Sequence, residues 1–261
     1  MKEQIKQLIE ASPFKVHIAI EDYRSNSVLF IEHERDVFSS ASVIKVPILI
    51  AILHRLQETN GDLQQMIDIA PQNRVDFSVL TEQKRTSATL EELLTWMTIT
   101  SDNTATNVCI DYLGMDGLNT YFNKIGLKQT HVQRKMMDFE RQQQGFDNET
   151  TAGDMQHLFK QIYEGTLLTP KWNEVALSIL CRQRSHESLK RYIIEDVKIA
   201  HKTGGLDTVD HDVGIFFMEQ GAYFIGIFVT EVTNNELAKR LIGAISKIVY
   251  DQFNTTKGEL V

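Results

Sequence analysis

The sequence lacks the features that mark several classes of protein. It has two cysteines in 261 residues, too few for a disulfide-rich scaffold. Basic residues do not predominate, and the net charge of −8 without a local lysine–arginine cluster argues against a nucleic-acid surface. The longest apolar run, residues 46–53, is too short to span a bilayer. There is no internal repeat, low-complexity segment or linker.

The composition that remains is typical of a globular protein. With 42% hydrophobic and 24% charged residues, the chain can bury a substantial core. Residues 1–14 predict an amphipathic helix and lack the long apolar core of a signal peptide. We therefore expect a cytoplasmic protein as the chain is written, and an extracellular or periplasmic one if a leader was removed. Cys109 and Cys181 are expected to be reduced packing residues.

Strand patterns occur at both ends of the chain, with helical patterns between them. The block from about residue 56 to about residue 192 is mostly helical, and residues 235–253 have the spacing of a helix with one buried face. Short β-branched and aromatic runs predict strands over residues 15–21, 28–32, 197–202, 213–218 and 223–229.

This order of elements predicts an α+β fold, with one antiparallel five-stranded sheet completed by both chain ends and flanked by helices. Residues 1–38 and 196–261 would form an α/β lobe, and residues 39–195 an inserted all-α lobe, within one structural unit. A functional site at the seam between two lobes is a common arrangement.

One apolar segment, residues 39–56, carries a serine and a lysine among bulky apolar side chains. A helix that is apolar on every side is normally buried in the middle of a domain. Ser42 and Lys45 would share one face of it, and Ser39 and Ser40 are suited to cap its first turn. Burial lowers the pKa of a lysine, whose neutral amine can accept a proton from a nearby hydroxyl. The same residues also fit a lysine that extends to solvent and a serine that only caps the helix.

Two further polar segments interrupt apolar stretches. Ser101, Asp102 and Asn103 lie inside a helical pattern and predict a short, capped break between two helices. Lys202 and Thr203 precede two glycines at the end of a strand, where a ligand can approach the backbone closely. Taken singly, an ordinary helix junction and an ordinary strand end account for them as well.

Taken together and in order, the three segments resemble the signature of penicillin-recognising serine enzymes: S-x-x-K at residues 42–45, S-D-N at 101–103 and K-T-G at 202–204. The spacing and the flanking residues are most similar to class A β-lactamases. Residues 150–155 (TTAGDM) also resemble the segment that follows the Ω loop of those enzymes. The resemblance covers nearly the whole chain. It implies a β-lactamase-type serine hydrolase that opens the β-lactam amide through an acyl-enzyme.

The resemblance implies a role for each matching residue. Ser42 would attack the carbonyl, Lys45 would accept its proton, and Ser101 would relay a proton to the leaving nitrogen. The substrate would be held by Asn103 at its side-chain amide, by Lys202 and Thr203 at its carboxylate, and by the amides of Ser42 and Gly205 at its oxyanion.

No cofactor or metal is expected, because the eight histidines form no H-x-x-x-H pair and the sequence has no C-x-x-C. As partner we expect a small-molecule substrate, a β-lactam or an acyl-D-alanine-like compound, with no nucleic acid. We also expect a monomer without a membrane span.

The Ω loop departs from the class A pattern. Class A enzymes activate the deacylating water with a glutamate, and counting two residues on from Arg134 reaches Met136, which cannot act as a base. Arg134 and Asn148 fall about where the family has its loop-closing arginine and aspartate. The nearest carboxylates are Asp138 and Glu140, of which we favour Glu140 as the base. Both also fit solvated loop charges.

This departure keeps three functions open. If a carboxylate reaches the deacylating water, the enzyme is a β-lactamase. If none does, Ser42 stays acylated, as in a penicillin-binding D,D-peptidase or an esterase-like hydrolase with slow deacylation. The third is a non-catalytic ligand-binding protein on the same fold, against which the intact Ser42, Lys45, Ser101 and Lys202 argue.

Overall fold

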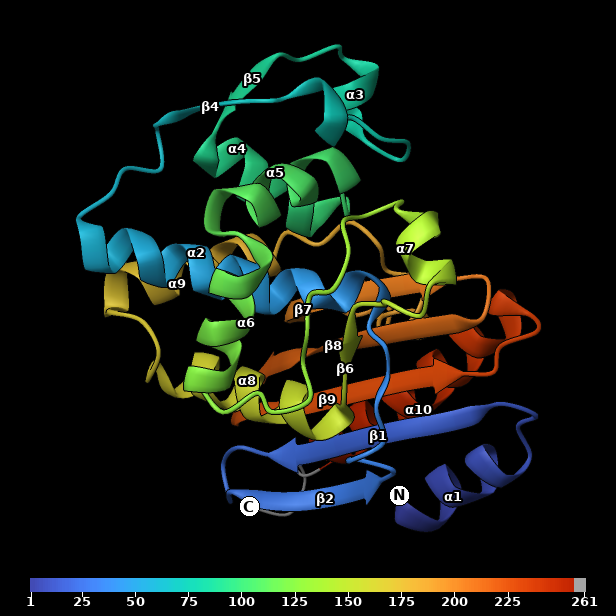
Figure 1. The fold of residues 1–261 in the computed structure, drawn as a ribbon. Helices are drawn as coiled ribbons and strands as arrows, with labels where there is room; N and C mark the ends of the chain where they lie inside the picture. The colour runs from blue at the N-terminus through green and yellow to red at the C-terminus, as the bar shows by residue number, and fades with distance from the viewer. Residues whose placement is uncertain (256–261) are drawn as a thin grey trace.

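A five-stranded antiparallel sheet forms the centre of the computed structural model, which describes residues 1–255 (Figure 1). The strand order is β2-β1-β9-β8-β7, so the two N-terminal strands stand beside the three C-terminal ones and the predicted α+β fold is confirmed. The strands are β1 (Lys15–Asp22), β2 (Ser27–Glu32), β7 (Lys198–Leu206), β8 (Val209–Met218) and β9 (Gly221–Thr230).

Helices cover both faces of the sheet. On one face, α1 (Lys2–Glu10) and α10 (Asn235–Thr255) pack with apolar strand residues into one core cluster. In Figure 1, α10 lies behind the strands. On the other face, α8 (Ala152–Glu164) packs against β1 and β9, and a second core cluster joins the sheet to the helices inserted between β2 and β7. The sheet is thus the middle layer of three.

The helix α2 (Lys45–Thr59) forms the centre of the inserted helical part. Every residue from Lys45 to Leu53 is buried, because other helices surround α2 on all sides, as the apolar pattern predicted. It packs against α4 (Leu90–Ile99), α5 (Asn103–Leu113), α6 (Met115–Lys124) and α9 (Pro170–Leu180). The same part of the chain also contains α3 (Val79–Glu82), which packs against α5, and α7 (Phe139–Gln143). A 3₁₀ turn, η2 (Pro71–Asn73), precedes α3.

The helical block also contains short strands that the sequence pattern did not indicate. β3 (Phe38–Ser39) pairs with β6 (Glu149–Thr150), and β4 (Met66–Asp68) pairs with β5 (Ser87–Thr89). Segments of two or three residues are too short to display the alternation from which strands are recognised. The β3–β6 pair matters for the site, because it fixes residues 149–150 beside the segment that leads into α2.

The predicted capping of the helix by Ser39 and Ser40 is wrong. Residues Ala41–Ile44 form a 3₁₀ helix, η1, and α2 begins only at Lys45. The Ser39 hydroxyl donates to Asp147 at 2.6 Å and the Ser40 hydroxyl donates to the carbonyl of Asn148 at 3.0 Å. Both serines therefore bind the loop before β6.

Strand β7 is longer than predicted. The apolar pattern ends near Lys202, but the strand runs on to Leu206 because it pairs with β8 in unbroken register, from Lys198 opposite Phe217 to Leu206 opposite Val209. The K-T-G segment therefore lies inside a strand rather than at its end.

The cysteines are as predicted: Cys109 is buried, Cys181 is half-buried, and both are free thiols. None of the helices within residues 1–255 is both long and apolar enough to cross a membrane.

Candidate active site

A cavity of about 610 Å³ lies where η1, the α4–α5 junction, residues 134–148 and the end of β7 meet. Its volume is in the range of small-molecule sites. Five of the predicted site residues line it: Ser42, Ser101, Asn103, Thr203 and Gly205. Two more, Lys45 and Lys202, are fully buried and bind Ser101. The structure thus gathers three segments that are far apart in the sequence.

Ser42 lies in η1, one turn before Lys45, at a place where β7 comes unusually close. A Cβ atom on Gly204 would stand 3.0 Å from the amide nitrogen of Ser42 and 3.1 Å from that of Val43. A side chain at position 204 would press on both amides, so glycine suits this close approach of two backbones. Of the two glycines that follow Thr203, Gly204 therefore allows β7 to pack closely against η1, while Gly205 lines the cavity.

Lys45 is held by three acceptors. Its Nζ donates to the carbonyl of Ser101 at 2.7 Å, to the hydroxyl of Ser101 at 3.0 Å and to Oδ1 of Asn103 at 3.0 Å. Burial lowers the pKa of Lys45 well below its usual value. The nearby charge of Lys202 lowers that pKa further, while the charge of Asp102 opposes both effects. A lysine in this setting can lose its proton and act as a base.

Ser101 lies at the predicted break between α4 and α5, in a left-handed conformation with φ of +60°. Asp102 caps α5 by accepting from the amide of Ala105 at 2.8 Å, so the capped junction is confirmed. The Ser101 hydroxyl oxygen accepts from Lys45 at 3.0 Å and from Lys202 at 3.1 Å. Because the Ser101 oxygen accepts from both lysines, the hydroxyl hydrogen can be donated to a third group, such as a substrate atom.

Lys202 supplies a second buried amine beside the cavity. Its Nζ also donates to the carbonyl of Thr203 at 2.7 Å. Burial lowers the pKa of Lys202 to about 7, although the charge of Asp212 raises it. Near neutral pH this amine is therefore poised between its charged and uncharged forms.

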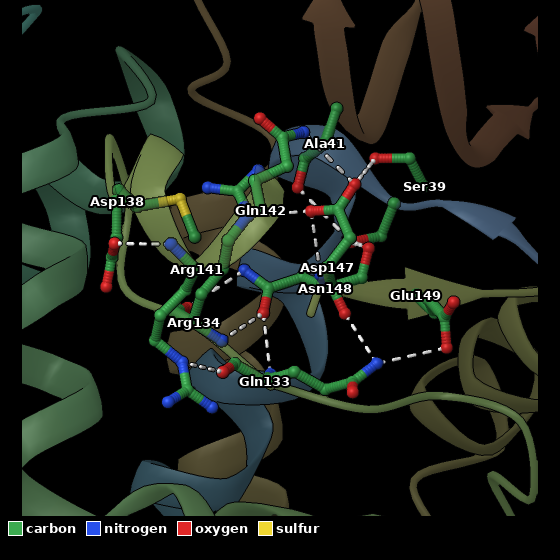
Figure 2. A network of polar contacts seen from close by, with 12 residues as sticks. Ser39, Ala41, Gln133, Arg134, Asp138, Arg141, Gln142, Asp147, Asn148 and Glu149 are labelled. Carbon is green, nitrogen blue, oxygen red and sulfur yellow. Dashed lines mark hydrogen bonds and ion pairs between the residues drawn. The ribbon is translucent and has the colours of Figure 1, made fainter. Parts of the chain in front are cut away.

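The loop that forms one wall of the cavity is closed by Asp147 rather than by Asn148 (Figure 2). Arg134 Nε donates to Asp147 Oδ1 at 2.8 Å, and the Arg134 side chain is only 6% exposed. Asn148 Oδ1 instead accepts from the backbone amides of Gln133 and Arg134, at 2.8 and 3.1 Å. Asn148 falls about where the family has its loop-closing aspartate, but its side-chain amide binds the backbone, and the neighbouring Asp147 forms the ion pair with Arg134.

Met136 occupies the place at which the resemblance expects the deacylating glutamate. Its amide donates to Oδ1 of Asn107 at 2.7 Å, and its carbonyl accepts from Nδ2 of Asn107 at 3.3 Å. The preceding Lys135 forms an ion pair with Asp111 at 2.7 Å. The backbone of Met136 and the side chain of Lys135 are therefore held to α5, and Met136 lines the cavity.

The two carboxylates predicted as alternatives lie elsewhere. Asp138 caps α7 by accepting from the amide of Arg141 at 3.1 Å, and Glu140 is exposed on α7. Neither is among the cavity-lining residues found within residues 1–255, whose carboxylates are Asp147 and Asp207. The structure therefore does not bring Glu140 to the site.

The chain matches the β-lactamase enzyme family over residues 1–253. It belongs to that family. A curated relative, β-lactamase VEB-1 of Pseudomonas aeruginosa, is 25% identical over 96% of this chain and 89% of its own. Among solved structures, PBP-A is 29% identical, covering 97% of this chain and 95% of its own, with a TM-score of 0.89. TLA-3 extended-spectrum β-lactamase is 19% identical, covering 97% of this chain and 98% of its own, with a TM-score of 0.90.

As a member of the β-lactamase enzyme family, the protein is a serine hydrolase of the β-lactamase type. Its site contains two residues that sequence reasoning passed over, Asn107 and Asp147. Asn107 lies four residues after Asn103 and therefore on the same side of α5, which was the signal available for it. Asp147 is adjacent to Asn148, and which of the two faces Arg134 depends on the local backbone.

Proposed function

We propose that this enzyme opens β-lactams and acyl-D-alanine-like amides by forming an acyl-enzyme on Ser42. The observation that carries the proposal is the placement of one hydroxyl, that of Ser101, between two buried amines at the floor of a cavity that Ser42 also lines. Lys45 follows Ser42 by three residues, about one helical turn, and an amine of lowered pKa close to a serine can activate that serine as a nucleophile.

The acylation step uses the contacts of Lys45. Ser42 Oγ attacks the amide carbonyl and its proton passes to the neutral Nζ of Lys45, so a C–O bond forms as the O–H bond breaks. Lys45 then returns a proton through the Ser101 hydroxyl, 3.0 Å away, to the leaving nitrogen as the C–N bond breaks. Nothing is consumed beyond the substrate, and Lys45 is neutral again when Ser42 is acylated.

The remaining residues would hold the substrate. Charged Lys202 with Thr203 suits a carboxylate. Asn103 lines the cavity, and its side-chain oxygen is bound to Lys45, while its amide nitrogen would face the acyl side chain. The backbone amides of Ser42 and Gly205 would stabilise the oxyanion.

One observation favours a second candidate, a penicillin-binding D,D-peptidase with slow deacylation. Met136 is clamped where a base would stand, and Glu140 lies outside the cavity lining. One solved structure 29% identical to this chain is an acyl-enzyme complex of a PBP-A variant with penicillin G, so an acyl-enzyme in this fold can persist. Between the two candidates only the rate of deacylation differs.

Intact-protein mass spectrometry over time with a penicillin, beside a chromogenic cephalosporin assay, tests both candidates. A transient adduct with steady turnover supports β-lactamase-type hydrolysis, and a lasting adduct without turnover supports the peptidase. Ser42→Ala should abolish the adduct and leave thermal unfolding nearly unchanged, whereas Ser40→Ala, the same change two residues away, should keep it. An adduct that persists in Ser42→Ala would remove Ser42 from the role of nucleophile.

A further inference from the structure

Lys202 is a buried amine whose direct partners are uncharged. Its side chain is fully buried, and within the described part of the chain the acceptors of its Nζ are the Ser101 hydroxyl and the Thr203 carbonyl. A buried ammonium without an anion nearby tends to lose its proton. The proposed function needs that charge to bind the substrate carboxylate, so something other than a direct ion pair must sustain it.

A buried carboxylate stands on the neighbouring strand. Asp212 on β8 is the cross-strand partner of Thr203 and is fully buried. Its Oδ1 accepts from Nδ1 of His201 at 2.8 Å, and its Oδ2 accepts from the amide of Leu189 at 3.0 Å. Two donors thus hold this carboxylate in place, and no lysine or arginine within residues 1–255 forms an ion pair with it.

The pair of His201 and Asp212 lies behind the strand that carries Lys202. His201 and Lys202 are consecutive in β7, so their side chains point to opposite faces of the sheet. Asp212 contacts His201 and therefore acts on Lys202 across the sheet rather than by contact. It is the charge that raises the pKa of Lys202 against the effect of burial.

We propose that Asp212, held by His201, is a positioning residue that keeps Lys202 charged from the opposite face of the sheet and thereby sets the affinity for the substrate carboxylate. The inference rests on the proposed function, in which Lys202 takes that carboxylate. Neither Asp212 nor His201 touches the substrate, because neither is among the residues that line the cavity.

Other titratable groups lie near Lys202 and near the His201–Asp212 pair. On the substrate side lies Lys45 on α2, whose own pKa is lowered by burial and by the charge of Lys202 and is raised by the charge of Asp102. Behind the sheet, the ring of His186 stacks on His201 with centroids 5.8 Å apart. His201 Nε2 is buried without a hydrogen-bond partner within residues 1–255, beside a cavity of about 390 Å³. That cavity is also lined by Lys190, Asp196 and Lys198.

The test compares the pH profiles of acylation by a penicillin, from about pH 5 to about pH 9. In the unmodified enzyme the rate should fall as the pH rises through about 7, because Lys202 loses its charge there. Asp212→Asn should move this alkaline limb down by about one pH unit and leave the acid side near the normal rate. Asp210→Asn is the matched control, since Asp210 is also a buried acid on β8 but binds Asn235.

The histidine offers a second pair of variants in case Asp212→Asn does not fold. His201→Leu removes the donor to Asp212 and should shift the limb in the same direction. His201→Asn places an amide donor near the position of Nδ1 and should restore the normal profile. A purely structural role would change stability and total rate in these variants but would leave the pH of the limb unchanged.

A titration of Lys202 by NMR in the ligand-free protein, with ¹³C-labelled lysine, makes the result independent of acylation. The Lys202 signal should titrate at lower pH in Asp212→Asn and at its normal pH in Asp210→Asn. An unchanged titration in Asp212→Asn would overturn the inference. If the unmodified enzyme forms no penicillin adduct, the proposed function fails, and the NMR titration alone decides whether Asp212 sets the charge of Lys202.

Discussion

The loop beside the site should depend strongly on Asp147. The carboxylate accepts from Arg134 Nε at 2.8 Å, from the Ser39 hydroxyl at 2.6 Å and from the amide of Asn148 at 2.8 Å. Gln142 adds a longer contact at 3.4 Å. Figure 2 shows these groups converging on one side chain. Asp147→Ala removes them all and leaves the buried guanidinium of Arg134 with the Lys135 carbonyl at 3.3 Å but without its ion-pair partner.

The size of the effect follows from burial. Removing one partner of a buried ion pair costs about 3–5 kcal/mol, and the Asp147 side chain is 21% exposed, so water replaces part of the loss. We therefore expect Asp147→Ala to lower the free energy of unfolding by about 3 kcal/mol. For a protein of this size, that corresponds to a fall in the melting temperature of roughly 6–12 °C.

Chemical unfolding, thermal unfolding and hydrogen exchange measure this change. The amides of Gln133 and Arg134, which donate to Asn148, should exchange faster in Asp147→Ala if the loop opens locally. Asp138→Asn, which touches only the exposed cap of α7, should cost about 1 kcal/mol or less. An Asp147→Ala protein within about 0.5 kcal/mol of the unmodified one, with unchanged exchange, would refute the reasoning.

Three further predictions concern the site and its supports. Met136→Glu places a carboxylate on the clamped backbone and should speed loss of the penicillin adduct by about 10²- to 10⁴-fold, measured by mass spectrometry; an unchanged decay would refute a base at this position. Gly204→Ala places a Cβ 3.0 Å from the amide nitrogen of Ser42, so β7 or η1 must shift slightly, and acylation should slow about 10-fold. Gly117→Ala, whose Cβ would meet nothing closer than 4.0 Å, should not slow it, and equal rates in the two variants would contradict the close approach. Burial lowers the pKa of His211 to about 4, below the 6.5 of an unfolded histidine. Neutral His211 therefore contributes its full share to the free energy of unfolding above pH 6.5, and this share is lost as the pH falls towards 4. Between pH 6.5 and pH 4, the free energy of unfolding measured by denaturant titration should fall by up to about 3 kcal/mol less in His211→Asn than in the unmodified protein. The same fall in both proteins would contradict this prediction.

The fold was predictable wherever many residues carried one pattern. The strands of the sheet and the apolar helix α2 were recognisable because hydrophobic burial acts on whole runs of side chains. The elements that were missed are the pairs β3–β6 and β4–β5, whose two or three residues carry no such pattern. Their pairing is imposed by the tertiary structure.

The candidate site was predictable as a set of residues but not as a set of contacts. The motifs named Ser42, Lys45, Ser101 and Lys202, and the structure brings these together. The motifs did not indicate that Gly204 seats β7 against η1, because that approach joins segments some 160 residues apart and depends on how the backbones meet.

The position of Met136 shows why the Ω loop gave the weakest prediction. A residue on this loop can be matched by counting from Arg134, but a relocated base can be judged only from where each side chain lies. Asn107 binds both the amide and the carbonyl of Met136. The loop therefore cannot slide to bring Glu140 into the cavity without breaking these two bonds and leaving the buried side-chain amide of Asn107 without these hydrogen-bond partners. In the proposed function, acylation and deacylation would therefore depend on different parts of the chain, and the side chain at position 136 would set the balance between them.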